Sequence, residues 1–110
     1  IDGGGLHRMY GFSKACLSAY TILYAKKYSH LKINACTPGY IQTDMTMPIS
    51  INKQASPEEL GMKRPDQGTI APMHLLMNKL TGNGHFYGSD AKRSPLDQYR
   101  SPGSPAYTED

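Results

Sequence analysis

The chain has 110 residues and a formal net charge of +3, from 12 Lys and Arg against 9 Asp and Glu. A charge this small, carried by dispersed basic residues, argues against a nucleic-acid-binding protein. No apolar run approaches the ~20 residues of a membrane-spanning helix, and the four His and two Cys lack the spacing of a metal site. We therefore expect one small domain with no nucleic-acid, membrane or metal partner.

The start of the chain suggests a partial sequence. It begins at Ile1 and passes directly into glycines at positions 3–5. We therefore expect the C-terminal fragment of a longer protein, with a processed precursor as the alternative. Residues 1–9 are predicted as a glycine-rich lead-in to the first helix.

Residues 10–28 carry the clearest helical pattern in the chain. Five apolar side chains recur at helical spacing and predict an apolar stripe along one face: Phe12, Cys16, Ala19, Tyr20 and Leu23. Lys26 and Lys27 fall in the last turn, where cations interact favourably with the helix dipole.

A short apolar run at residues 33–36 predicts a buried strand of a parallel sheet, because its length favours a strand over a helix. Pro38-Gly39 follows this strand directly. Residues 40–55 have no sustained periodicity and are predicted as a surface loop. Ser56, followed by a proline and two acids, has the composition of a helix start.

The last part of the chain contains one more helix and one more strand. A helix is predicted from residue 65 or 66 to 79, with five side chains facing the core: Ile70, Met73, Leu76, Met77 and Leu80. A glycine-containing turn at 81–84 leads to a predicted strand at 85–88. The polar, proline-containing residues 89–110 are predicted as an extended or poorly ordered tail.

This order of elements predicts an α/β fold, because helices alternate with strands. Two strands do not form an independently stable sheet, so the sheet would be incomplete on its own. We expect residues 1–88 to be part of one domain and residues 89–110 to be the polar tail.

Tyr10 and Lys14 are the first candidates for chemistry. Residues four apart lie on one face of a helix, so the phenol and the ammonium would share one site. A nearby cation favours a phenolate, and such a tyrosine can exchange a proton with a substrate oxygen. From the spacing alone, an exposed pair without function is the alternative.

Four segments, in order and spacing, resemble the classical short-chain dehydrogenase/reductase family. Residues 10–14 match its Y-x-x-x-K pair, with a serine before the lysine, and residues 34–39 match its N-x-x-x-P-G segment. Residues 43–45 match its T-D-M, and residues 84–88 resemble its terminal strand. Within the family the chain is most similar to the branch of carbonyl reductases and plant menthone and salutaridine reductases.

This resemblance implies a Rossmann-like, doubly wound parallel sheet, of which the chain would supply the C-terminal half. It implies an NAD(P)-dependent oxidoreductase that transfers a hydride between the cofactor and a small carbonyl or alcohol substrate. That branch typically uses NADP, so NADP is expected and NAD is the alternative. The same branch implies a monomeric parent enzyme, which we expect to be cytoplasmic.

The resemblance also implies roles for individual residues. Tyr10 would be the general acid in carbonyl reduction, and Lys14 would favour its phenolate and bind the nicotinamide ribose. Pro38-Gly39 would let the backbone pass close to the nicotinamide, because glycine suits close approach. Thr43 and the backbone of Ile41 would hold the carboxamide of the cofactor.

Two parts of the family pattern are missing from the chain. No G-x-x-x-G-x-G phosphate loop follows a strand, and the family's catalytic serine would lie before Ile1. We therefore expect the chain alone to be inactive. Two alternatives stay open: the extended branch of sugar-nucleotide epimerases and dehydratases, which shares Y-x-x-x-K, and a non-catalytic truncated module that acts through protein interaction.

Overall fold

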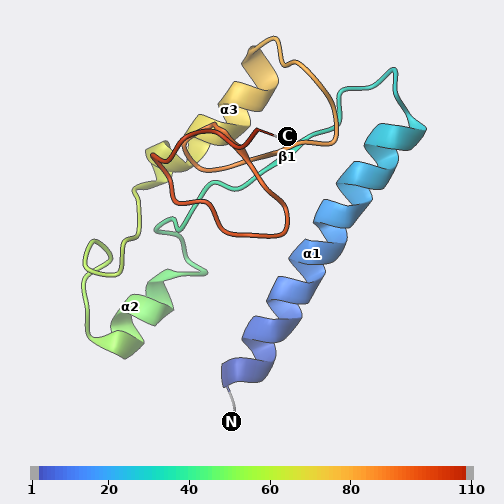
Figure 1. The fold of residues 1–110 in the computed structure, drawn as a ribbon. Coiled ribbons are helices and arrows are strands. Elements are labelled where there is room, and N and C mark those ends of the chain that lie inside the picture. Colours follow the sequence, from blue (N-terminus) through green and yellow to red (C-terminus); the bar gives the residue numbers. More distant parts are fainter. Residues whose placement is uncertain (1–2, 109–110) are drawn as a thin grey trace.

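The computed structural model describes residues 3–108. Its helices and strands follow the chain in this order: α1 (Gly3–Lys27), β1 (Ala35–Cys36), α2 (Met47–Lys53), the 3-10 helix η1 (Pro65–Thr69), α3 (Ile70–Met77), β2 (Phe86–Tyr87) and β3 (Arg93–Ser94). In Figure 1, α1 is a long rod beside the rest of the molecule, and β1 is labelled between it and α3. The α/β class predicted from the sequence is confirmed.

The three strands form one mixed sheet in the order β1-β2-β3. β1 and β2 are parallel neighbours, with Ala35 opposite Phe86 and Cys36 opposite Tyr87. Both lie within segments predicted as strands, and the parallel sheet expected for the first is confirmed for this pair. The predicted strand at residues 33–36 is shorter and half-buried rather than buried. The reason is that, within residues 3–108, β1 pairs with only one strand.

Two asparagines fix how the parallel strands meet. The side-chain oxygen of Asn83 accepts a hydrogen bond from the backbone N–H of Ile33 at 2.6 Å, and its amide donates to the carbonyl of Leu31 at 2.7 Å. The side-chain oxygen of Asn34 accepts from the backbone N–H of His85 at 2.9 Å. These bonds tie the approach to β1 to the approach to β2, so the side chains set the register of two very short strands.

Helix α1 differs from its prediction at both the start and the apolar face. It begins at Gly3, so the expectation of a lead-in before the helix is wrong for residues 3–9, while Ile1 lies outside the described residues. The helical period is confirmed, yet the predicted stripe is exposed, with Phe12 at 73%. The helix packs through its C-terminal end, where Ala25 is buried and its carbonyl accepts from the Asn83 amide.

The segment predicted as a loop at residues 40–55 contains α2. Its proline occupies the first turn, and Gln54 ends the helix in a left-handed conformation with φ 51°. Ser50 is buried and its hydroxyl donates to the carbonyl of Ala55. A helix of seven residues is too short to establish a periodicity, which explains why the pattern did not predict it.

The region from Ser56 to the end of α3 contains a turn, followed by the adjoining helices η1 and α3, and has no helix at Ser56. Ser56 and Glu59 cap each other through backbone and side chain at 2.7 and 3.2 Å, but the turn they begin stops at Gly61, where φ is +73°. In α3 the predicted core face is wrong: four of its members are exposed, namely Ile70, Met73, Leu76 and Met77. Ala71 is fully buried instead, at 0% exposure. The buried face is therefore rotated by one residue, and His74 on this face lies 5.5 Å from the Tyr87 ring.

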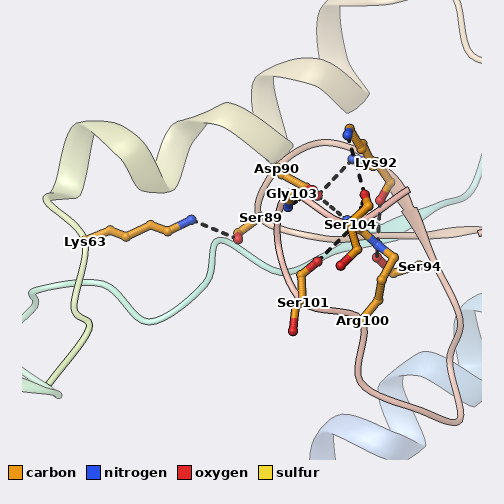
Figure 2. Close-up of polar contacts among 9 residues, drawn as sticks. All are labelled: Lys63, Ser89, Asp90, Lys92, Ser94, Arg100, Ser101, Gly103 and Ser104. Carbon is orange, nitrogen blue, oxygen red and sulfur yellow. Dashed lines mark hydrogen bonds and ion pairs between the residues drawn. The ribbon is translucent and has the colours of Figure 1, made fainter. Parts of the chain in front are cut away.

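The last segment keeps the predicted turn and strand at residues 81–88, with Gly82 and Gly84 at φ +84° and +73°. Residues 89–108 are more ordered than the tail we expected. They contain β3, and a network around Arg100 closes the loop that follows it (Figure 2). The division of the chain at residue 88 stays a prediction.

Candidate active site

Tyr10 and Lys14 lie on one side of α1. The Lys14 ammonium is 5.4 Å from the centre of the Tyr10 ring, as expected for residues one helical turn apart. Between them, the Ser13 hydroxyl donates to the carbonyl of Tyr10 at 2.8 Å and is held against the helix backbone. Tyr10 is 53% exposed, so its hydroxyl and the nearby cation are both open to a ligand.

Gly39 follows β1 at the carboxyl end of the parallel pair. Its φ of +91° lies in the left-handed region, and a Cβ at this position would be 3.0 Å from the Cβ of Ser89. Ser89 follows β2 and is buried, at 4% exposure. Only glycine fits this backbone, and the ends of β1 and β2 are therefore in direct contact.

A pocket of about 380 Å³ lies at the same edge of the sheet. Its lining combines aromatic rings and prolines with hydroxyls and cations; it includes Gly39, Tyr40, Lys63, Phe86, Ser89, Pro95, Tyr99 and Arg100. Ligands of open α/β sheets bind outside the carboxyl ends of the strands. The pocket has the volume of a small-molecule site, for which ~300–1,000 Å³ is typical.

The segment predicted to hold the carboxamide is organised by Thr46, which the sequence pattern did not indicate. The Thr46 hydroxyl donates to the carbonyl of Ile41 at 2.5 Å and accepts from the backbone N–H of Thr43 at 2.9 Å. Ile41 is buried, whereas Thr43 and Pro38 are exposed. This local network begins the turn into α2 and leaves the Thr43 side chain at the surface.

Arg100, in the wall of the pocket, forms an ion pair with Asp90 (Figure 2); both residues are half-buried. Burial raises the pKa of Asp90, but hydrogen bonds from the backbone N–H of Gly103 and from the Arg100 guanidinium outweigh this effect and lower the pKa to about 2. Arg100 also donates to Ser94 at 2.9 Å and to the carbonyl of Ser104 at 2.7 Å. The guanidinium therefore fixes the loop that forms one side of the pocket.

The predicted site residues fall into two groups. Tyr10 and Lys14 form the first group, on α1. The second group is the segment after β1: Gly39 lines the pocket, and Pro38, Ile41 and Thr43 are close to it in the sequence. Within residues 3–108, no hydrogen bond, ion pair or ring contact joins Tyr10 or Lys14 to residues 38–43. The catalytic and cofactor-binding roles of all six residues stay predictions.

Sequence reasoning missed the polar residues that shape the pocket, namely Lys63, Ser89, Asp90 and Arg100. Ser89 could have been found, because it directly follows a predicted strand at the edge where ligands bind. Lys63 and Arg100 lie in segments without periodicity, and nothing in their spacing links them to the sheet.

Comparison with known proteins identifies relatives among plant oxidoreductases. The chain is 47% identical over 60 residues to (−)-isopiperitenone reductase of Mentha piperita, covering 51% of this chain and 19% of that protein. It is 31% identical over 80 residues to (+)-neomenthol dehydrogenase of Arabidopsis thaliana and 30% identical over 79 residues to short-chain dehydrogenase/reductase 1 of Saponaria officinalis, each match covering 71% of this chain.

The chain spans about a fifth of the length of these relatives, between 19% and 23%. No family model matches it, and no solved structure matches it. Among the described residues, no helix has both the length and the apolar character needed to cross a membrane. The relatives nevertheless confirm the resemblance predicted from the sequence, because the proteins that this chain matches are plant reductases and dehydrogenases of the short-chain type.

Proposed function

We propose that the chain is the C-terminal part of an oxidoreductase that transfers a hydride between NAD(P)H and a small carbonyl or alcohol substrate. The observation that carries the proposal is the Tyr10–Lys14 pair on one helix, with the Lys14 ammonium 5.4 Å from the centre of the Tyr10 ring. The relatives of the chain are reductases and dehydrogenases. NADP is the proposed cofactor, with NAD as the alternative. We further propose a monomeric, cytoplasmic parent enzyme with a doubly wound sheet.

The two side chains are suited to proton transfer at a substrate oxygen. A tyrosine hydroxyl that donates its proton leaves a negative charge, and an ammonium close to the ring stabilises that charge. Tyr10 would therefore donate a proton to the carbonyl oxygen, while Lys14 would stabilise the phenolate and bind the ribose of the cofactor. Proton transfer of this kind contributes ~10²–10⁴-fold to a rate.

Gly39 borders the pocket at the carboxyl end of the parallel strands. Ligands of open α/β sheets bind at this edge, and the nicotinamide is proposed to lie there. When bound there, the nicotinamide would supply the hydride. Gly39 and Pro38 would then position this ring, and Thr43 with the Ile41 backbone would hold its amide.

The chain alone is proposed to be inactive, because it lacks a phosphate loop and the family's serine. The alternative function is that of a non-catalytic module that binds another protein. It is supported by the exposed apolar side chains of α1, among them Phe12 and Leu23. Such a module would need neither Tyr10 nor Lys14.

The test is carbonyl-dependent oxidation of NADPH by the chain joined to a matching upstream half, compared with the chain by itself. We expect activity only in the joined protein and loss of most of it in Tyr10→Phe. Tyr20→Phe is the matched control, since it removes another exposed hydroxyl from the same helix. Activity that survives Tyr10→Phe, or that Tyr20→Phe removes equally, would contradict the proposed role.

A further inference from the structure

Lys63 holds a cation at the carboxyl end of the parallel strands. Its backbone pairs with the segment after β1, donating to the carbonyl of Tyr40 at 2.8 Å and accepting from Gln42 at 2.9 Å. Its ammonium donates to the Ser89 hydroxyl at 3.1 Å (Figure 2) and lies 4.0 Å from where a Cβ of Gly39 would be. Paired backbone on one side and a buried hydroxyl on the other therefore fix the ammonium beside Gly39.

The charge on Lys63 is not compensated within the described residues. Its polar partner there is the neutral Ser89 hydroxyl, and an ammonium has three donors. Arg100, on another wall of the same pocket, is neutralised by Asp90. The pocket therefore offers an oxygen ligand one half-buried cation with hydrogen-bond donors to spare.

The rest of the pocket is suited to an apolar body. Aromatic rings and prolines contribute to its walls: Tyr40, Phe86, Pro95, Tyr99 and Pro102. A volume of about 380 Å³ holds a compact small molecule rather than a polymer. A negatively charged oxygen group forms its strongest hydrogen bonds with a cation that is not already paired with a carboxylate.

We propose that this pocket binds a small apolar carboxylate, with Lys63 as the residue that selects the carboxylate end. As an assignment of substrate class it rests on the proposed function, because the pocket borders Gly39, where the nicotinamide would lie. Lys63 is a binding residue in this proposal and takes no part in proton or hydride transfer. Ser89 holds its ammonium in place through the hydrogen bond between them.

The experiment is a calorimetric titration of the protein with benzoate and with benzamide, its neutral counterpart of similar shape. We expect benzoate to bind about tenfold more tightly, as a charge-assisted hydrogen bond supplies. Lys63→Met should abolish this preference and Lys63→Arg should retain most of it. Lys79→Met, which removes an exposed lysine beyond the end of α3, is the control and should change nothing.

Three results would overturn the proposal: equal affinity for the two probes, no binding of either, or a preference that survives Lys63→Met. NADPH oxidation is measured separately on the same variants joined to a matching upstream half. A Lys63-dependent preference without oxidation of NADPH by the joined protein would refute the oxidoreductase and leave the carboxylate site standing. Oxidation of NADPH without the preference would refute the carboxylate site alone.

Discussion

The first two-thirds of α1 and the loop around Arg100 differ in exposure and in the hydrogen-bond and ion-pair partners of their side chains. On α1 the apolar side chains and the Tyr10–Lys14 pair are exposed. Around Arg100, a guanidinium with 8% side-chain exposure meets a carboxylate, a hydroxyl and a backbone carbonyl. One region is complete within residues 3–108, and the other has a face suited to packing against a further layer of structure.

The comparison shows where stability and chemistry lie in this chain. The loop around Arg100 should be sensitive to single substitutions, because the Arg100 guanidinium and the Asp90 carboxylate each have several hydrogen-bond partners. Substitutions on the exposed part of α1 should change the free energy of unfolding little and should affect only the activity. Four predictions test this difference, from the largest expected effect on stability to the smallest.

Arg100→Met should cost about 2–3 kcal/mol in the free energy of unfolding, because it leaves the half-buried Asp90 carboxylate without its cation. Arg64→Met is the matched control: Arg64 pairs with Asp66 at 2.8 Å on the surface, with 72% of its side chain exposed. That pair is worth at most about 1 kcal/mol. Urea unfolding of both variants measures the difference, and equal losses would show that the Arg100 network is not special.

Stability should also fall at acid pH through Asp90. Its pKa is lowered to about 2 in the folded protein, below the ~3.9 of a free aspartate. The stabilisation is therefore present above pH ~4 and is lost as the pH falls toward 2, by roughly 2 kcal/mol. The free energy of unfolding, measured between pH ~4 and ~2, should no longer fall with pH in Asp90→Asn and should still fall in Asp97→Asn. An unchanged pH dependence in Asp90→Asn would assign the acid destabilisation to another group.

Gly39→Ala should cost about 1–3 kcal/mol, from the left-handed backbone and from the clash with Ser89. Gly103→Ala separates the two causes, because Gly103 has φ +90° and nothing within 4 Å of an added Cβ. It should cost less than Gly39→Ala by about 1 kcal/mol. Equal costs in urea unfolding would mean that contact between the strand ends is looser than described.

Phe12→Ala should change the free energy of unfolding by less than about 0.5 kcal/mol, because its side chain is 73% exposed. Met62→Ala, at a buried position with 5% exposure, should cost about 2–5 kcal/mol. The same urea experiment compares the two. A large loss in Phe12→Ala would show that the face of α1 is already packed against something in solution.

The sequence predicted those features that depend on local pattern. It found a helix through Tyr10 and Lys14, strands near residues 33–36 and 85–88, and the glycine turn between α3 and β2. It missed α2, which is too short for a period, and it misjudged the buried face of α3. On α3 four of the residues predicted for the core are exposed, and the small Ala71 is fully buried instead.

The candidate site could be predicted only in part, for a physical reason. The Tyr10–Lys14 spacing lies within one helical turn, so sequence alone brings the two side chains together. Lys63 and Ser89 meet across 26 positions in the chain, and Asp90 meets Arg100 across a loop. Contacts of this kind depend on how the chain folds back, which no local periodicity encodes.

The most direct test of the central claim is a double-mutant cycle on Tyr10 and Lys14 in the protein that carries its upstream half. Carbonyl-dependent NADPH oxidation should fall ~10²–10⁴-fold in Tyr10→Phe, with cofactor affinity largely retained, while Lys14→Ala should lower both. The double variant should lose little beyond the worse single one, because the two residues act as a unit. Losses that multiply, or near-normal turnover in Tyr10→Phe, would contradict the proposed mechanism.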